Sequence, residues 1–239
     1  MKRLAIIPAR GGSKRIPRKN VRDFCGKPMI SHVLDTAARS NLFNVIHVST
    51  DDNEISSVAT QYGFPPDFAR PEFLADDVTP IMPVLRYVVE EYAKRDQKFD
   101  EIWLIMACAP LITENDLVQA AKLFGKSDKR KALLAVSEYQ APIEWAFSRS
   151  EDGTLIPEQS GMFAVRSQDL EKKYFDAGSF AAFFPERITN STGAGSDEGF
   201  VGFVLPKGSA IDIDEEQDWK QAEAIFLARS ERLDRNSRD

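Results

Sequence analysis

Residues 4–20 read LAIIPARGGSKRIPRKN, an apolar run that leads directly into a basic turn. The apolar part, residues 4–8, is short and nearly uninterrupted, which is typical of a buried parallel strand. Five Lys or Arg residues follow within residues 9–20, around a pair of glycines. A glycine pair after a strand lets the backbone turn tightly and point N–H groups at an anion, while neighbouring cations neutralise phosphate charge. The stretch therefore indicates a phosphate cradle, and a solvated basic turn is the alternative.

The turn differs from the two common nucleotide-binding loops. A Walker A loop requires G-x-x-x-x-G-K-[ST] and a Rossmann fingerprint requires G-x-G-x-x-G, and the stretch GGSKR satisfies neither. The later GAG at residues 193–195 also fails, because Glu198 stands where a third glycine would be. The motif alone therefore does not identify the ligand.

Strand-like runs alternate with helical patterns along much of the chain. We expect strands at residues 45–50 and 101–107, and helices at residues 28–40, 52–62, 80–95, 113–124 and 215–233. Asp51 or Asp52 can cap the second of these helices, and Thr113 can cap the fourth. Such alternation predicts an α/β fold, a Rossmann-like and mostly parallel sheet sandwiched by helices.

The length favours one domain with a small excursion. A chain of 239 residues with 43% hydrophobic content can bury a real core, so residues 1–239 are expected to form a single domain. After about residue 137 the pattern breaks into short pieces punctuated by Pro and Gly. We interpret residues 138–175 as an inserted small lobe, with apolar positions at Ile143, Trp145 and Phe147.

Charge and cysteine content restrict the partners and the compartment. A net charge of −6 argues against a general nucleic-acid or membrane-surface binder, because those partners need a broad excess of basic charge. Cys25 and Cys108 are the only cysteines and are far apart in the sequence, which predicts a reducing, cytoplasmic location. No apolar stretch approaches the roughly 20 residues of a membrane span, so we expect a soluble, unprocessed protein.

The late sequence AIDID, residues 210–214, carries two carboxylates. Asp212 and Asp214 are two positions apart, which on a strand places both on one face, where a hard cation with oxygen ligands could bind. Mg²⁺ is the natural occupant. The alternative is that Asp214 only caps the helix that follows.

Several motifs together resemble one family. IIPARGGSKRIPRKN, CGKPMI, VSTDD, FARPEFLADD and the late DID closely resemble the CMP-sialic acid synthetase family of nucleotidyltransferases, over nearly the whole chain. Residues 166–178, RSQDLEKKYFDAG, look most like the branch that activates pseudaminic acid, a nine-carbon sialic-acid-like sugar. The resemblance implies a fold of the nucleotide-diphospho-sugar transferase type. It also implies a cytidylyltransferase that couples CTP to a nonulosonic acid and releases pyrophosphate.

The resemblance also implies a nucleotide site. Arg10 and Lys14 would contact the triphosphate and act in catalysis with Asp212 and Asp214, which would hold Mg²⁺, while Asn20 would hold the cytosine nucleotide. The full set of implied nucleotide-binding residues is Ala9, Arg10, Gly11, Gly12, Ser13, Lys14, Lys19, Asn20, Arg70 and Asp77. Two of these have plain alternatives, since Lys19 could be a surface lysine and Asp77 could cap the helix that starts near Thr79.

The sugar site is expected on the segment that resembles the pseudaminate branch. Arg166 can pair a carboxylate with two parallel hydrogen bonds. The other implied sugar-binding residues are Gln168, Asp169, Tyr174, Asp176 and Gly178. The alternative is an ordinary helix N-terminus capped by Ser167.

The sequence departs from the family at the floor and side of the pocket. Met106 and Cys108 stand where the family usually has Gln or Tyr and a Thr, and Phe175 and Ser179 replace a His and a Gln of the pseudaminate branch. The same chemistry on sialic, legionaminic or 3-deoxy-manno-octulosonic acid is therefore an alternative. A catalytically silent sugar-nucleotide binding protein is a second alternative, which the retained acid pair argues against.

Two further expectations complete the prediction. Family members pair through the small lobe, so the resemblance implies a homodimer in which a neighbour's residues approach the sugar. His32 and His47 lie in a predicted helix and a predicted strand, where a structural role is expected. Proton removal from the sugar hydroxyl is then assigned to a magnesium-bound hydroxide or to Asp212.

Overall fold

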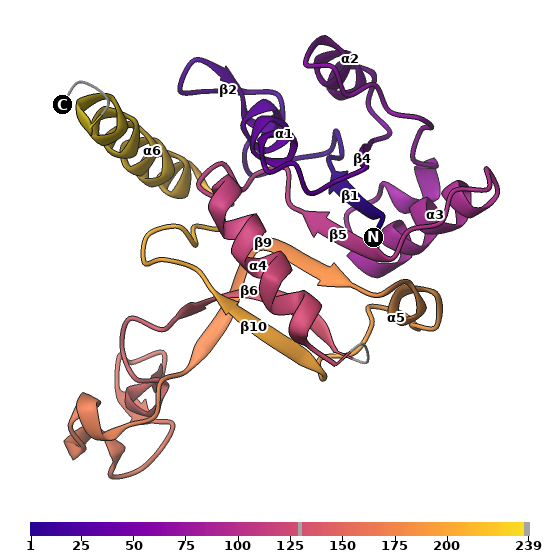
Figure 1. The fold of residues 1–239 in the computed structure, drawn as a ribbon. Coiled ribbons are helices and arrows are strands. Elements are labelled where there is room, and N and C mark those ends of the chain that lie inside the picture. The colour runs from indigo at the N-terminus through magenta and orange to yellow at the C-terminus, as the bar shows by residue number, and fades with distance from the viewer. Residues whose placement is uncertain (129–130, 237–239) are drawn as a thin grey trace.

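The computed structural model describes residues 1–128 and 131–236. Its elements are arranged around one central sheet (Figure 1). In chain order they are β1 (Arg3–Pro8), β2 (Asp23–Phe24), β3 (Lys27–Pro28), α1 (Met29–Arg39), β4 (Val45–Ser49), α2 (Asn53–Gln61), η1 (Glu72–Leu74), α3 (Ile81–Ala93), β5 (Glu101–Ile105), α4 (Glu114–Lys126), β6 (Ala132–Glu138), η2 (Ile143–Trp145), β7 (Phe147–Arg149), β8 (Leu155–Pro157), η3 (Met162–Ala164), η4 (Ser167–Asp169), β9 (Tyr174–Phe183), α5 (Pro185–Thr189), β10 (Phe200–Val204) and α6 (Glu216–Asn236).

The central sheet has six strands in the order β10-β6-β9-β5-β1-β4. Strand β1 is parallel to β4 and β5, and β10 is parallel to β6, whereas β9 runs antiparallel to both of its neighbours. The predicted mostly parallel α/β sheet is therefore confirmed. Each strand and helix assigned from the sequence is present within a few residues of its expected bounds.

Helices cover both faces of the sheet. Helices α1, α2 and α4 pack on one face, in a core that includes Ile7, Val33 and Trp103. Helices α3 and α5 pack on the other, around Leu85 and Ile188. Buried positions run through the whole of β5, which explains why this strand reads as a continuous apolar run. The cores hold the carboxyl ends of β1 and β5 at one edge of the sheet.

Strands β9 and β10 were not predicted from the sequence. Phe180 of β9 belongs to the core on one face and Ala181 to the core on the other, so this strand has no polar face to give an alternating pattern. Strand β10 lies in residues 187–208, a region in which the sequence predicts no helix or strand. Its interior Gly202 weakens the strand signal, because glycine is uncommon within strands. In the structure a Cβ at this position would lie 3.3 Å from a methyl carbon of Val136.

Helix α6 closes the fold at the edge where β1 ends. Trp219 and Ala222 of this helix are buried against Ile16, Cys108 and Ile213 in a third core. The residues after β1, the residues after β5 and the segment before α6 are thereby packed together. Within residues 1–128 and 131–236, we find no helix with the length and apolar content that crossing a membrane requires.

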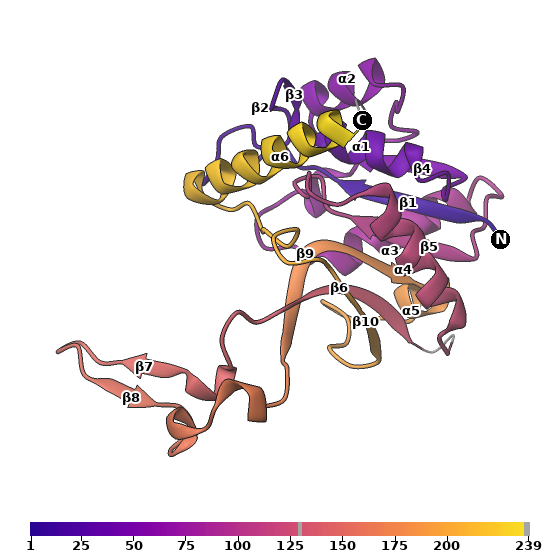
Figure 2. The ribbon, with the colours of Figure 1, turned by 60° about the vertical axis from the view of Figure 1, so that its left-hand side comes forward.

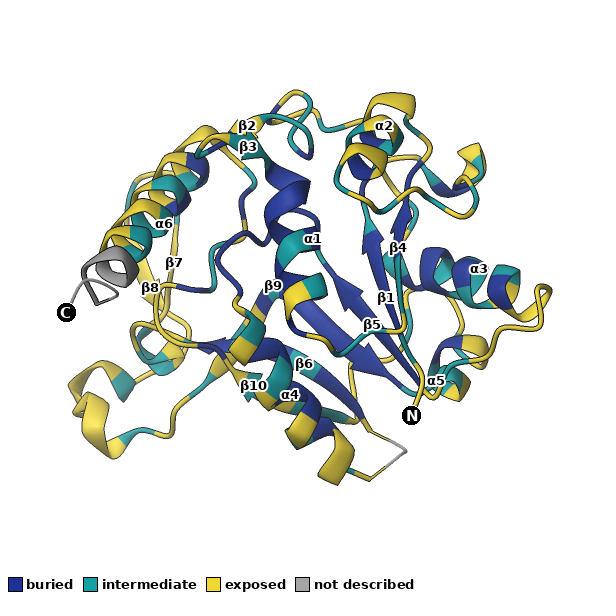
Figure 3. Ribbon diagram, turned by 45° about the horizontal axis from the view of Figure 1, so that its top comes forward, coloured by how far each residue is buried: buried dark blue, intermediate teal, exposed yellow. Residues whose placement is uncertain are grey.

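Residues 139–173 leave the body of the molecule between β6 and β9 (Figure 2). They contain the β7–β8 hairpin and three short 3₁₀ turns. The hairpin strands are exposed along their whole length, in contrast to the dark blue strands of the central sheet (Figure 3). Leu155, Ile156 and Phe163 are each more than half exposed, at 58%, 53% and 69%. The excursion thus presents apolar side chains that its own chain does not cover.

Candidate active site

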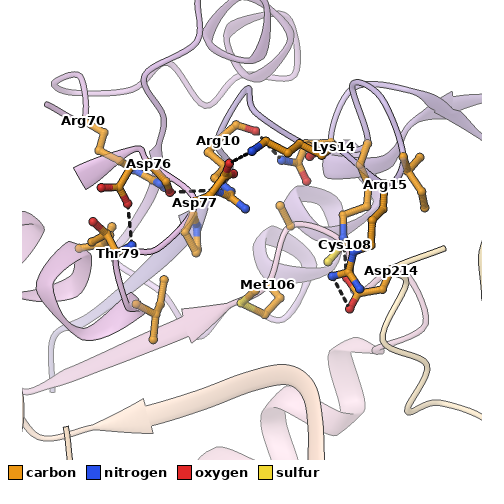
Figure 4. Close-up of a pocket in the computed structure, with 18 of the residues that line it drawn as sticks. Arg10, Lys14, Arg15, Arg70, Asp76, Asp77, Thr79, Met106, Cys108 and Asp214 are labelled. Carbon is orange, nitrogen blue, oxygen red and sulfur yellow. Dashed lines mark hydrogen bonds and ion pairs between the residues drawn. The ribbon is translucent and has the colours of Figure 1, made fainter. Parts of the chain in front are cut away.

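One pocket lies where β1 and β5 end (Figure 4). The residues that line it come from the loop after β1, the 70–81 segment that leads into α3, the segment after β5, and the AIDID segment. They include the predicted nucleotide-binding residues Arg10, Ser13, Lys14, Lys19, Asn20, Arg70 and Asp77, and the predicted metal ligand Asp214.

The loop after β1, residues 9–20, which we call the phosphate loop, is fixed at both ends. The Ala9 N–H donates to the Ser49 carbonyl, which ties the start of the loop to the end of β4. Asn20 is buried, and its side-chain amide donates to the Arg10 carbonyl at 3.1 Å. Asn20 therefore closes the loop as well as lining the pocket.

Four cations of the phosphate loop are paired with two carboxylates. Arg10 and Lys14 both contact Asp77, with the Arg10 guanidinium at 2.6 Å from the carboxylate (Figure 4). Arg15 and Lys19 both contact Asp214, at 2.8 and 3.4 Å. The loop thus concentrates positive charge on the pocket and holds it in place with acidic partners.

Asp77 does not act as the cap of the helix that starts near Thr79, and Lys19 is not a surface lysine. Asp76, rather than Asp77, accepts hydrogen bonds from the Val78 and Thr79 N–H groups and so shapes the turn before α3. The ammonium group of Lys19 is largely buried and donates to the Ile213 carbonyl at 2.6 Å. Asp77 and Lys19 are therefore directed to the pocket, not to a helix cap or to solvent.

Arg70 forms a buried wall of the pocket. Its guanidinium donates to the hydroxyl and the carbonyl of Ser49, at 3.1 and 2.5 Å. The backbone N–H of Arg70 donates to the Thr50 carbonyl. Burial lowers the pKa of Arg70 to about 10, which still leaves the side chain charged at neutral pH. Arg70 joins the loop before α3 to the end of β4.

The acid pair is not on a strand, so that expectation is wrong. Residues 210–214 form an irregular connection between β10 and α6. The side chain of Ile213 is buried in the third core, and this anchors the two flanking carboxylates. Partial withdrawal from water raises the pKa of Asp212, and the charges of Asp214 and Asp176 raise it further.

The alternative role of Asp214 as a helix cap is performed by another residue. The side chain of Asp218 accepts hydrogen bonds from the N–H groups of Asp214 and Glu215, at 3.1 and 2.8 Å. This leaves the carboxylate of Asp214 to pair with the cations of the phosphate loop.

Strand β9 brings two of the predicted sugar residues to the acid pair. Gly178 has a φ of +59°, and a Cβ at this position would lie 3.2 Å from the carboxyl carbon of Asp212. The N–H of Gly178 donates to the side chain of Asp176 at 2.9 Å. Glycine is thus required here by backbone conformation and by the close approach of a carboxylate.

The other predicted sugar residues lie away from the pocket. Arg166, Gln168 and Asp169 are exposed on residues 139–173, where Arg166 pairs with Asp169 at 2.8 Å. The predicted helix start at Ser167 is a single 3₁₀ turn. Tyr174 is exposed at the beginning of β9. The structure therefore does not bring these four residues together with the acid pair of the same chain.

The acid pair has a donor set that suits magnesium. Among the described residues, no group of three or more His, Cys, Asp or Glu side chains is placed to hold a metal ion. Two carboxylates suffice for Mg²⁺ when substrate phosphates complete its coordination. The mutual repulsion that raises the pKa of Asp212 is the kind of strain that a bound cation would relieve.

Other residues that line the pocket are not among the predicted nucleotide, sugar or metal ligands. Arg15 was not chosen, although it is one of the five cations of the loop. Asp76 was also not chosen, and its carbonyl accepts a hydrogen bond from Arg10 at 2.7 Å. Met106 and Cys108, the two departures from the family, form the floor below the cations (Figure 4). Burial raises the pKa of the Cys108 thiol, which keeps it protonated.

Both histidines are structural. His32 is buried in α1, and its ring Nε2 donates a hydrogen bond to the Phe24 carbonyl at 2.7 Å. His47 is buried in β4 beside Phe68 and Tyr92, and burial lowers its pKa to about 4. Neither lines the pocket described above.

The fold and the pocket define the class of protein. A mostly parallel sheet that presents a glycine-containing basic loop and an acid pair at its strand ends is the arrangement of a nucleotidyltransferase. The family model described as cytidylyltransferase matches residues 4–131, just over half of the chain. The chain belongs to the cytidylyltransferase family.

Individual relatives and solved structures agree with this assignment. A protein named pseudaminic acid cytidylyltransferase from Campylobacter jejuni is 38% identical over 97% of this chain and 99% of its own length. A CMP-N,N'-diacetyllegionaminic acid synthase from Legionella pneumophila is 31% identical over 98% of this chain and 100% of its own. A solved structure of CMP:2-keto-3-deoxy-manno-octonic acid synthetase with CTP has a TM-score of 0.71 and 16% identity, over 96% of this chain and 100% of the other. That structural likeness supports the fold.

Proposed function

We propose that this enzyme couples CTP to pseudaminic acid in the presence of Mg²⁺ and gives the CMP-sugar and pyrophosphate. The observation that carries the chemistry is the pocket in which four cations of the phosphate loop meet Asp77 and Asp214. The choice of sugar is supported by the relative of 38% identity, which aligns over almost the whole of both chains.

The reaction is an in-line displacement at the α-phosphorus of CTP. The anomeric oxygen of the sugar acid forms the new bond to phosphorus, and the bond to the β-phosphate oxygen breaks as pyrophosphate leaves. Negative charge then builds on the non-bridging and leaving oxygens. Arg10, Lys14, Arg15 and Lys19 are the charges available on this loop to offset it.

Asp212 and Asp214 would hold the magnesium ion. Bound there, Mg²⁺ would offset the charge of the phosphate oxygens and lower the pKa of a coordinated water. Asp212 is also the carboxylate that would accept the proton of the sugar hydroxyl. Gly178, which carries no side chain, lets the Asp212 carboxylate approach the β9 backbone closely.

The small lobe would form a homodimer contact in the cytoplasm. Its hairpin exposes Leu155 and Ile156, and it carries Arg166 and Gln168 at a distance from the chain's own pocket. A second subunit that covers the hairpin would explain both the exposed apolar side chains and the separation of the sugar residues.

The deciding experiment is pyrophosphate release from CTP and Mg²⁺ with pseudaminic, legionaminic, sialic and 3-deoxy-manno-octulosonic acids offered separately. A reaction without sugar is the control. Release with pseudaminic acid alone is the expected result. Release with another acid would keep the chemistry and move the specificity to Cys108, Phe175 and Ser179. Folded protein that binds CTP but releases nothing with any acid would favour a silent sugar-nucleotide binding protein.

A further inference from the structure

Asp52 lies directly beside the phosphate loop, although it does not line the pocket. Strands β1 and β4 are parallel neighbours with Pro8 opposite Ser49, so the segments that follow them begin side by side. Asp52 caps α2, and its side chain accepts a hydrogen bond from the Ile55 N–H at 3.0 Å. A helix cap is a sufficient reason for an aspartate at this position. Two further contacts require more than a cap.

The first contact is with Gly11. A Cβ placed on Gly11 would lie 2.4 Å from a carboxylate oxygen of Asp52, a separation that atoms cannot adopt. A Cβ on the next residue, Gly12, would meet no atom within 4 Å. The two glycines of the loop therefore have different reasons to be there, and Gly11 is required because the carboxylate of Asp52 packs against its backbone.

The second contact is with Arg18, at the other end of the loop. The guanidinium of Arg18 donates two hydrogen bonds to the two carboxylate oxygens of Asp52, at 2.6 and 2.8 Å, and also contacts Glu54. Arg18 has a φ of +57°, in the left-handed region that non-glycine residues seldom occupy. A bidentate pair of this kind fixes direction as well as distance, and here it holds an unfavourable backbone conformation.

The pairing also resolves a problem of charge. A carboxylate beneath a loop that receives a triphosphate would repel the ligand if its charge were not offset. Arg18 neutralises Asp52, so it is committed to the scaffold, while Arg10 and Lys14 remain directed into the pocket. Because Asp52 contacts the start of the loop and Arg18 lies near its end, one carboxylate spans the whole phosphate loop.

We propose that Asp52 is a positioning residue for the nucleotide: it latches the phosphate loop to α2 through Gly11 and Arg18 and so sets the loop in its triphosphate-binding conformation. This inference rests on the proposed use of CTP for its effect on binding, but the latch itself is a property of the ligand-free protein.

The test uses Asp52→Asn in the full-length protein. Asparagine is as good a helix cap as aspartate, so its amide oxygen keeps the Ile55 hydrogen bond while the ion pair with Arg18 is lost. Hydrogen exchange of residues 9–20 without ligand should become at least about tenfold faster, and exchange of α2 should not change. CTP should bind about tenfold more weakly by calorimetry, and the KM for the sugar acid should stay the same.

Two controls separate a latch from a cap. Thr113→Ala removes the cap of α4, whose hydroxyl accepts from the Asp116 N–H, and it should lower the melting temperature without altering CTP binding. The double variant Asp52→Asn with Arg18→Gln should bind CTP no more weakly than either single variant, because the two changes remove one interaction.

The outcome that would overturn the proposal is an Asp52→Asn variant whose residues 9–20 exchange as slowly as in the unaltered protein. A failure of the proposed function gives a different result. In that case the unaltered protein would release no pyrophosphate with any of the sugar acids, whereas the exchange measurement would still report whether Asp52 holds the loop.

Discussion

The nucleotide side and the sugar side of this enzyme are built in different ways. On the nucleotide side, residues from four separate segments meet in one pocket and contact one another directly. On the sugar side, Asp176 and Gly178 reach the acid pair, but Arg166, Gln168 and Asp169 are exposed on a lobe that projects from the body. A single chain thus assembles the proposed nucleotide-binding residues in one pocket but leaves most of the proposed sugar-binding residues apart from it.

Topology explains this difference. The carboxyl ends of β1, β4 and β5 lie side by side because the strands are parallel, so the loops that follow them must converge. The lobe is an insertion between β6 and β9, and its hairpin pairs only with itself. Nothing in the central sheet dictates where its side chains point.

The strongest test of the nucleotide side is Asp214→Ala. We expect kcat to fall by about 100- to 1,000-fold, because the variant loses the proposed metal ligand and the partner of Arg15 and Lys19. The measurement is steady-state pyrophosphate release, with circular dichroism to confirm folding. A chelator should inactivate the unaltered enzyme to a similar extent, and added Mg²⁺ should restore it.

Glu215→Ala is the matched control, because this neighbouring acid is exposed and does not line the pocket. Full magnesium-dependent turnover by Asp214→Ala would show that the metal site lies elsewhere.

The test of the sugar side is Arg166→Ala. We expect the KM for the sugar acid to rise about tenfold with little change in the KM for CTP, because Arg166 would pair with the sugar carboxylate under the proposed function. Arg149→Ala, an exposed arginine of the same lobe, is the control. An unchanged KM in Arg166→Ala would move the carboxylate site to another residue.

Mixing the two variants sharpens the comparison further. If the lobe of one subunit completes the pocket of its partner, Arg166→Ala and Asp214→Ala subunits that exchange in solution should regain part of the activity. If each chain uses its own lobe, the mixture should be as inactive as its components.

A smaller effect is expected from Asp77→Asn. The carboxylate of Asp77 occupies the two cations that the triphosphate would use, and an exposed ion pair contributes about 0.2–1 kcal/mol. Removing this internal competitor should tighten CTP binding by about threefold, as measured by calorimetry. Weaker binding would instead show that Asp77 contacts the nucleotide, as the family resemblance implies.

The smallest effect is expected at Cys108, in the floor of the pocket between the nucleotide side and the sugar side. Cys108→Thr restores the hydroxyl that the family usually has, and a neutral hydrogen bond at the weak end of the usual range contributes about 0.5 kcal/mol, which is about a twofold change in an equilibrium constant. We expect the KM for the sugar acid to change by about twofold at most, with CTP binding unaltered. A large change in CTP binding would place Cys108 at the nucleotide instead.

The sequence was most informative where the structure is regular and local. The run at residues 4–8 and the capping residues Asp52 and Thr113 identified their elements correctly, because each depends on near neighbours. Strand β9 escaped notice because its first residues are exposed or half-buried and only its later part is buried, so neither an alternating pattern nor one apolar run extends over the whole strand.

The same limit applies to the site. The cations of the phosphate loop could be chosen from one motif, but the pairing of Arg15 with Asp214 joins residues that only the folded chain brings together. The acid pair was chosen on the assumption of a strand that is absent from residues 210–214, and of its two members Asp214 lines the pocket. Side chains on the lobe depend on a contact that no local pattern records.

The packing of α6 has a consequence for how the enzyme is made. The acid pair and the helix that buries Ile213, Trp219 and Ala222 follow the whole of the central sheet in the chain. A nascent chain on the ribosome can therefore build the sheet and its phosphate loop before the proposed metal ligands Asp212 and Asp214 are synthesised. The last helix to be translated is also the one that packs these two carboxylates' anchor, Ile213, into the protein.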